Sequence, residues 1–156
     1  MKPTEEAPDV RGLLRSAGLR VTGPRVAVLG VLQAHPHSTA ESVATRARRL
    51  AGPVSTQTVY DVLHACTGAG IVRKLVPAGS AARYETRVGD NHHHLVCRSC
   101  GVTVDVDCAV GAAPCLTPSN DWGFTIDEAE VVFWGQCHTC QNSPTTPRTT
   151  TTEVQA

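Results

Sequence analysis

The sequence is poor in aromatic residues and contains no long apolar run, and each of these scarcities excludes something. Aromatic residues make up 4% of the 156 residues and hydrophobic residues 41%, so the interior must be built from valine, leucine, alanine and isoleucine. No apolar run approaches the roughly 20 residues that a helix needs to cross a bilayer. The N-terminal stretch MKPTEEAPDV carries acids and has no apolar core, so it is not a secretory signal. We therefore expect a cytoplasmic protein with no membrane partner.

The chain also lacks net charge, but its two halves carry opposite charge. Residues 1–88 hold 12 of the 14 lysine and arginine residues and six of the 14 acids, whereas residues 89–156 hold two basic and eight acidic residues. The basic half suggests a polyanion partner. The second half contains six of the seven cysteines and four of the seven histidines. Composition predicts one module over 1–88, frayed in its first eight residues, a second over 89–141, and a disordered Thr/Pro-rich tail over 142–156.

Helical periodicity begins soon after the N-terminus and continues through three segments. Asp9 begins the first segment, and Thr22 is the expected N-cap of the second, whose apolar residues run all round it as in a buried helix. In the third segment, Ser38 and Glu41 have the spacing of a capping box, and apolar residues as far as Leu50 share one face. The basic residues that end this segment are expected to be solvated: Arg46, Arg48 and Arg49.

A fourth segment, STQTVYDVLHACTGAG, combines a buried stripe with a polar face. The stripe consists of Val59, Val62, Leu63 and Cys66. The polar face carries Gln57, Tyr60, Asp61 and His64. Two strands, IVRKLV and AARYET, follow as a hairpin. This order predicts an α+β protein with an N-terminal winged helix-turn-helix domain, in which Gln57 and Thr58 approach the DNA major groove and Arg73 and Lys74 of the hairpin contact phosphate.

The second module contains two cysteine pairs of the form Cys-x-x-Cys. The pairs, Cys97 with Cys100 and Cys137 with Cys140, are 36 residues apart. Four thiolates make a closed structural zinc site. Buried or disulfide-forming cysteines are the disfavoured alternative in a reducing compartment. Of the other cysteines, Cys66, Cys108 and Cys115 are expected to pack in the interior, and a redox pair of the last two is the weaker alternative.

Strand signals surround the cysteine pairs, and we expect a small α/β domain there. HLVC and VTVDVD are predicted strands, and FTIDEAEVVFWGQC is a predicted long strand. Three consecutive histidines enter the first of these strands, so His92 and His94 face one side and His93 the other. Two imidazoles on one side form half of a metal site. The nearby acids are Glu85 and Asp105.

Several of these segments together resemble the ferric uptake regulator (Fur) family over roughly residues 10–141. The resemblance is carried by AGLRVTGPR, STAES, TVYDVLHACTGAGIVRK, RYE, HHHLVCRSCG and CHTC. Within the family, the chain looks most like the repressors that accompany catalase-peroxidase genes. Members are homodimeric, metal-dependent repressors that bind double-stranded promoter DNA. The resemblance therefore implies a transcriptional repressor with a dimerisation domain in its second half.

The resemblance also assigns residues. It implies structural Zn²⁺, one per subunit, on the four cysteines of the two pairs. It implies a regulatory Fe²⁺ or Mn²⁺, one per subunit, on His37, Glu85, His92 and His94, with Asp105 matching the carboxylate of the peroxide-sensing branch. The DNA-contacting tyrosine of the family aligns with Tyr60 and a basic contact with Arg20. Two positions depart from the family: Ala129 stands where a third metal site has histidine, and Asp61 stands where some iron-sensing members have arginine.

These observations favour a repressor of oxidative-stress genes that is released when peroxide oxidises a ligand of the regulatory metal. An iron- or zinc-availability sensor that represses metal-uptake genes is the alternative within this class. A metal-dependent hydrolase is disfavoured, because the sequence offers no nucleophile beside a base and five protein ligands leave little room for substrate and water. A metal-storage module would explain the ligands but not the tyrosine-bearing helix and the basic hairpin.

Overall fold

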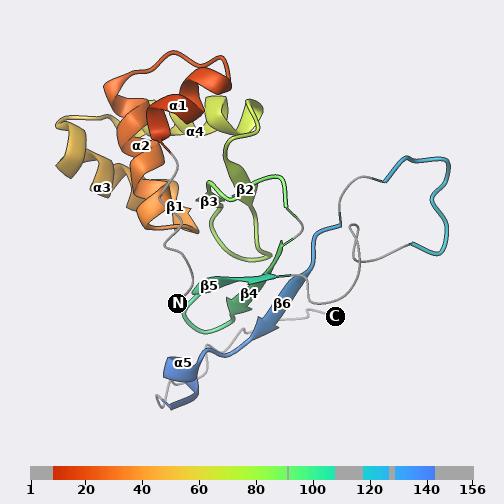
Figure 1. The fold of residues 1–156 in the computed structure, drawn as a ribbon. Coiled ribbons are helices and arrows are strands. Elements are labelled where there is room, and N and C mark those ends of the chain that lie inside the picture. Colours follow the sequence, from red (N-terminus) through yellow and green to blue (C-terminus); the bar gives the residue numbers. More distant parts are fainter. Residues whose placement is uncertain (1–8, 91, 108–117, 127–128, 143–156) are drawn as a thin grey trace, which may run out of the picture. The chain divides into compact units, whose positions relative to one another are not determined.

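The computed structural model describes residues 9–90, 92–107, 118–126 and 129–142 (Figure 1). The chain forms two compact units, Met1–Asn91 and His92–Ala156. The predicted frayed start, Cys108 and Cys115, and the predicted tail beyond Asn142 lie outside the described residues. Within the described part of the chain, every helix is too short or too polar to cross a membrane.

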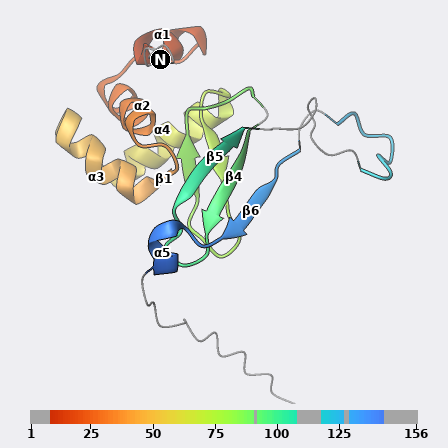
Figure 2. The same ribbon diagram turned by 60° about the horizontal axis from the view of Figure 1, so that its bottom comes forward.

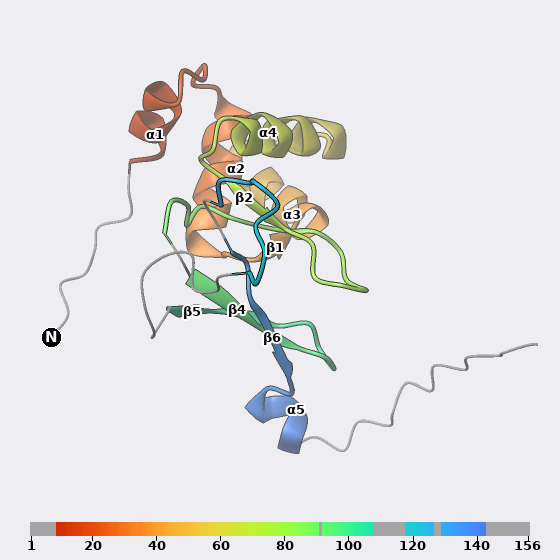
Figure 3. The same cartoon turned by 90° about the vertical axis from the view of Figure 1, so that its right-hand side faces the viewer.

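Four helices and a small sheet make up the first unit. The helices are α1 (Val10–Ser16), α2 (Gly23–Ala34), α3 (Ala40–Ala51) and α4 (Thr56–Gly68). The carboxylate of Asp9 caps α1, and, as predicted, the hydroxyl of Thr22 caps α2, where it accepts a hydrogen bond from the backbone N–H of Arg25. Helix α2 packs against α1, α3 and α4 (Figure 3), which explains its apolar character.

Helix α3 begins differently from the prediction. Ser38 lies in a two-residue strand, β1 (Ser38–Thr39), and donates its hydroxyl hydrogen bond to the carbonyl of His35. The N-cap is Thr39, whose hydroxyl accepts from the backbone N–H of Ser42, so the Ser38 capping box is wrong. Periodicity places Leu50 on the apolar face of α3, but the side chain is 69% exposed in the last turn of the helix. The apolar residues of the earlier turns are buried.

The predicted hairpin is present, and β1 extends it into a three-stranded sheet. β2 (Arg73–Leu75) and β3 (Arg83–Glu85) pair antiparallel, and β1 adds to the other edge of β3 in the order β1-β3-β2. The predicted apolar stripe of α4 is fully in the core. The first unit is therefore a winged helix-turn-helix, with α3 and α4 as the two helices of the motif.

The second unit is built around a three-stranded sheet in the order β5-β4-β6 (Figure 2). β4 (His92–Cys97) pairs antiparallel with β5 (Thr103–Asp107) and parallel with β6 (Val132–Gly135), and a short helix, α5 (His138–Asn142), follows β6. The prediction of one long strand is wrong, because only the four residues of β6 find partners on β4. Phe124 and Ile126, which belong to the predicted strand, lie exposed outside it.

Candidate metal centres and nucleic-acid interface

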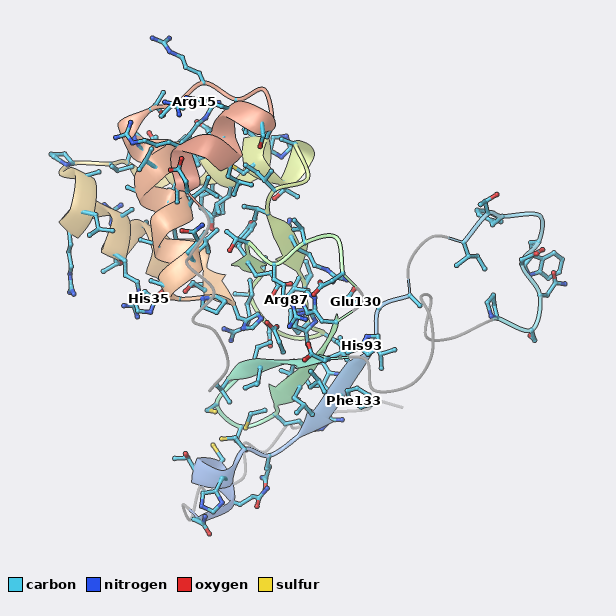
Figure 4. All side chains as sticks on the ribbon, viewed as in Figure 1. Arg15, His35, Arg87, His93, Glu130 and Phe133 are labelled. Carbon is cyan, nitrogen blue, oxygen red and sulfur yellow. The ribbon has the colours of Figure 1, made fainter. Side chains whose placement is uncertain are left out.

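The four cysteines of the two pairs meet at one end of the second sheet. Cys97 is the last residue of β4, and its register partner on β6 is Gly135, two residues before Cys137. Because β4 and β6 are parallel, their carboxyl ends lie at the same end of the sheet, and both cysteine pairs are found there. The four sulfur atoms lie within 4.8 Å of one another, and in Figure 4 yellow sulfur atoms gather beside α5. The predicted cysteine cluster is confirmed.

The geometry and the proton affinities of this cluster fit a zinc ion. The Sγ atoms of Cys100 and Cys137 are 3.7 Å apart, and a tetrahedral ion with Zn–S bonds of about 2.3 Å needs sulfur atoms about 3.8 Å apart. Backbone N–H groups of Cys100 and Cys137 that donate to the Cys97 sulfur lower the pKa of that thiol to about 6. Hydrogen bonds to Cys137 and Cys100 raise the pKa of Cys140 to about 12. The backbone thus stabilises the thiolate form of Cys97, which is the form that binds a metal ion.

The first unit carries a buried histidine–carboxylate pair. His37 immediately precedes β1, and Glu85 ends β3; antiparallel pairing of Ser38 with Tyr84 brings the two side by side. His37 Nε2 lies 2.7 Å from Glu85 Oε2, and both side chains are buried. His37 has a φ of 57°, a left-handed conformation that is uncommon outside glycine. Its carbonyl accepts a hydrogen bond from Arg83, which holds this backbone in place.

The second unit carries two histidines that face one carboxylate. His94 is the register partner of Asp105 across β4 and β5. Asp105 Oδ1 lies 3.5 Å from His94 Nε2 and 3.8 Å from His92 Nε2, distances longer than a hydrogen bond. As predicted from strand alternation, His93 is on the other side, where its ring centre lies 6.4 Å from that of Phe133 (Figure 4).

The donor sets of these two half-sites suit a metal that exchanges. Each of them combines imidazole nitrogen with carboxylate oxygen, which is the mixed donor set that Fe²⁺, Mn²⁺ and Zn²⁺ accept. The first half-site has two donors and the second has three, so neither fills the coordination of a six-coordinate ion by itself. Such sets bind less permanently than four thiolates, because nitrogen and oxygen donors leave positions for water.

The exposed face of α4 carries the polar residues expected at a DNA interface. Tyr60 and Gln57 are exposed, and each donates a hydrogen bond to a carboxylate at 2.8 Å, Tyr60 to Glu41 and Gln57 to Asp61. Thr58 is half-buried, and its hydroxyl is hydrogen-bonded to that of Ser55. The remaining predicted contacts are placed as follows: Arg20 is exposed before α2, Arg73 is half-buried on β2, and Lys74 is exposed on β2.

Sequence reasoning missed two residues that organise this face. Arg48 is exposed, as expected, but it also donates to the carbonyl of Val54 and the hydroxyl of Thr56, both at 2.8 Å, and so ties α3 to the start of α4. Glu41 was assigned only to a helix cap, but its carboxylate accepts from Tyr60. The pairing of residues 19 positions apart leaves no local pattern that could have revealed it.

A winged helix-turn-helix with a tetrathiolate cluster and two histidine–carboxylate half-sites defines a metal-binding transcriptional regulator, and comparison with known proteins agrees. A sequence profile of the Ferric uptake regulator family matches residues 16–133. The chain is 62% identical over 138 residues to "Transcriptional regulator FurA" of Mycobacterium tuberculosis, covering 88% of this chain and 94% of that protein. It is 58% identical over 134 residues to "Ferric uptake regulation protein 1" of Mycolicibacterium fortuitum, covering 86% and 83%.

Solved structures give the same result. The fold matches that of the ferric uptake regulator from Pseudomonas aeruginosa with manganese, with a TM-score of 0.63 and 28% identity over 83% of this chain and 98% of that one. The chain belongs to the ferric uptake regulator family. It is therefore a metal-dependent transcriptional regulator rather than an enzyme, and it binds promoter DNA as a dimer.

Proposed function

We propose that this protein is an iron-responsive repressor in which one exchangeable divalent ion controls the affinity for promoter DNA. The ion, Fe²⁺ or Mn²⁺, would be held by His37, Glu85, His92, His94 and Asp105, and a permanent Zn²⁺ by the four cysteines of the cluster. The observation that carries this proposal is the chemistry of the two half-sites. Buried imidazoles beside carboxylates suit an exchangeable ion, and they differ in kind from the sulfur cluster.

The proposed control works by ordering the two units. His37 and Glu85 belong to the unit that carries α4, whereas His92, His94 and Asp105 belong to the other unit. An ion that uses ligands from both would restrict the motion of one unit against the other. In a dimer, the two copies of α4 would then be held at one spacing before DNA arrives. The entropy of ordering would be lost on metal binding rather than on DNA binding, which increases the affinity for the operator.

Iron availability is the favoured signal because of the relatives. Two similar proteins of Mycolicibacterium fortuitum, 58% and 52% identical to this chain, are named ferric uptake regulation proteins 1 and 2. The His and carboxylate ligands also fit Fe²⁺ better than a soft metal such as Cu⁺. The targets would then include genes of metal uptake, repressed when iron is abundant.

Peroxide sensing is the second candidate, and Asp105 is the observation that favours it. This carboxylate faces both His92 and His94, and a further oxygen donor strengthens a site for Fe²⁺. Fe²⁺ held by these residues would supply the electron that reduces peroxide to hydroxide and a hydroxyl radical. That radical would oxidise the imidazole of His37 or His92, and the modified side chain would bind metal poorly.

Two measurements test these candidates. For the first, DNA binding by the full-length protein is titrated with Mn²⁺, which does not react with peroxide in this way; both candidates predict that occupancy alone restores binding, and no effect of Mn²⁺ would reject both. For the second, the Fe²⁺-loaded protein is treated with peroxide and its peptides are examined by mass spectrometry. Oxygen added to His37 or His92 together with loss of DNA binding would support peroxide sensing. Unchanged histidines and unchanged DNA binding would reject it and leave the iron-responsive function standing.

A further inference from the structure

A carboxylate lies on the face of the protein that should approach DNA. Tyr60 is 41% exposed on α4, and its hydroxyl donates a 2.8 Å hydrogen bond to Glu41 Oε1 in the first turn of α3. An acid near a helix N-terminus is favoured by the helix dipole. The dipole does not account for the bond to Tyr60, and a negative charge beside a phosphate backbone opposes binding.

We propose that Glu41 is a positioning residue that decides which base Tyr60 recognises, a proposal that rests on the predicted contact of Tyr60 with DNA. A tyrosine hydroxyl has one hydrogen to donate and lone pairs that accept. An ionised carboxylate can only accept, so the hydroxyl hydrogen is committed to Glu41. The side of the hydroxyl that meets DNA is therefore an acceptor.

An acceptor selects particular base edges in the major groove. The exocyclic amino groups of adenine and cytosine donate there, whereas guanine presents N7 and O6 and thymine presents O4 as acceptors. Tyr60 held by Glu41 would accept from an adenine or cytosine amino group. It would disfavour guanine or thymine at the same position of the same strand, and it would make no hydrogen bond to a phosphate oxygen.

Two further observations agree with this assignment. The bond to Tyr60 lowers the pKa of Glu41, and the bond to Glu41 raises the pKa of Tyr60, so at neutral pH the acid stays ionised and the phenol keeps its hydrogen. On the same face of α4, Asp61 takes an amide hydrogen of Gln57 at 2.8 Å. Carboxylates thus occupy donors of both exposed side chains.

The experiment begins with selection of duplexes from a randomised library by the full-length, Mn²⁺-loaded protein. The same selection with Tyr60→Phe identifies the base pair whose preference needs the hydroxyl. Affinities for the four versions of that pair are then measured by fluorescence anisotropy for the wild type and for Glu41→Ala, Glu41→Gln and Glu41→Asp. Circular dichroism checks that each variant folds.

The three Glu41 variants separate the hydrogen bond from the charge. Gln keeps an acceptor oxygen without the charge, whereas Asp keeps the charge on a side chain one methylene too short to reach Tyr60. We expect the wild type and Glu41→Gln to prefer adenine or cytosine at that position by about five- to tenfold, and Glu41→Ala and Glu41→Asp to lose the preference. Glu41→Ala should have no further effect on it in the Tyr60→Phe background.

The outcomes that overturn the proposal differ in what else they overturn. If Glu41→Ala and Glu41→Asp keep the preference that Tyr60→Phe loses, Glu41 does not position Tyr60, although Tyr60 still contacts DNA. A preference that follows charge, lost in Gln and kept in Asp, also rejects the proposal. If Tyr60→Phe keeps every preference of the wild type, the hydroxyl of Tyr60 recognises no base and the proposal is rejected, while metal-dependent binding in the same assay remains intact.

Discussion

The two units of this protein are stabilised in different ways. The first has a contiguous apolar core that joins all four helices to the small sheet. In the described part of the second, only Val96 and Cys97 are buried apolar residues, and the buried polar ones are the three histidines of β4 and Thr103. Several apolar side chains of its sheet are instead about half exposed, among them Leu95, Val104 and Phe133.

This contrast teaches which part of the molecule depends on metal. Burial of apolar surface stabilises the first unit without any ion. In its described residues the second unit buries little apolar surface, so we expect the sulfur cluster to contribute to its folding. We therefore expect the first unit to keep its fold without metal, and the second unit to depend on the ion held by its sulfur cluster.

Loss of the sulfur cluster should have the largest effect. We expect Cys137→Ser to abolish zinc binding and to unfold the second unit, because structural zinc contributes on the order of 10 kcal/mol to the folding of small domains. The helical signal of the first unit should persist in circular dichroism, and zinc content is measured by atomic absorption. Cys66→Ala is the control, since this thiol lies in the core of the first unit and should leave the zinc content unchanged. Loss of all helical signal in Cys137→Ser would contradict the independence of the units.

A cavity in the apolar core of the first unit should have the next largest effect, and this effect should be confined to the stability of the first unit. Leu63 is 1% exposed on α4. Leu63→Ala should lower the free energy of unfolding by about 2–5 kcal/mol in urea, because the removed methyl groups leave a cavity. Leu50→Ala, at an exposed position of α3, should change it by less than about 0.5 kcal/mol. A fall in zinc content of the folded Leu63→Ala protein would show that the units are not separately stabilised.

Removal of one ligand of the exchangeable ion should weaken metal-dependent DNA binding without changing the zinc content. His37 is buried against Glu85, whereas His35, two residues earlier, is exposed. We expect His37→Ala to raise the Mn²⁺ concentration needed for half-maximal operator binding by about tenfold or more, because the ion loses one of its five proposed ligands. His35→Ala should match the wild type. Equal titration curves for the two variants would remove His37 from the regulatory site.

A helix cap of the first unit should give the smallest effect. Thr39→Ala should destabilise the first unit by about 1 kcal/mol, because the hydroxyl satisfies the backbone N–H of Ser42 at the start of α3. Ser38→Ala loses only an exposed bond to the carbonyl of His35 and should cost less. Thermal unfolding followed by circular dichroism measures both, and the reverse order would restore the sequence-based assignment of Ser38 as the cap.

Local patterns predicted what depends on local chemistry. Periodicity and spacing predicted the start of the first helix near Asp9, the Thr22 cap, the apolar stripe of α4 and the two cysteine pairs, because each needs only neighbouring residues in a fixed spacing. The prediction of the α3 cap was wrong because Ser38 and Thr39 are both good N-caps, and periodicity places the start of a helix only to within a residue or two.

Pairings between residues distant in the sequence could not be predicted from local patterns. β1 exists only because β3 offers it an edge, and this pairing is what brings His37 to Glu85. The predicted strand through Phe124 and Ile126 ends up short because β4 pairs with only four residues of it. The bond from Tyr60 to Glu41 likewise depends on how α3 packs on α4.

Operator binding with and without the exchangeable metal shows most directly whether this ion controls the affinity for DNA. The full-length protein, with its zinc retained, is titrated against labelled promoter DNA by fluorescence anisotropy at fixed ionic strength, in the presence of Mn²⁺ or of a weak chelator that leaves zinc bound. We expect Mn²⁺ to tighten binding by about tenfold or more, and His94→Ala to abolish this gain without loss of zinc. Equal affinity of the two forms of the wild type would contradict this expectation.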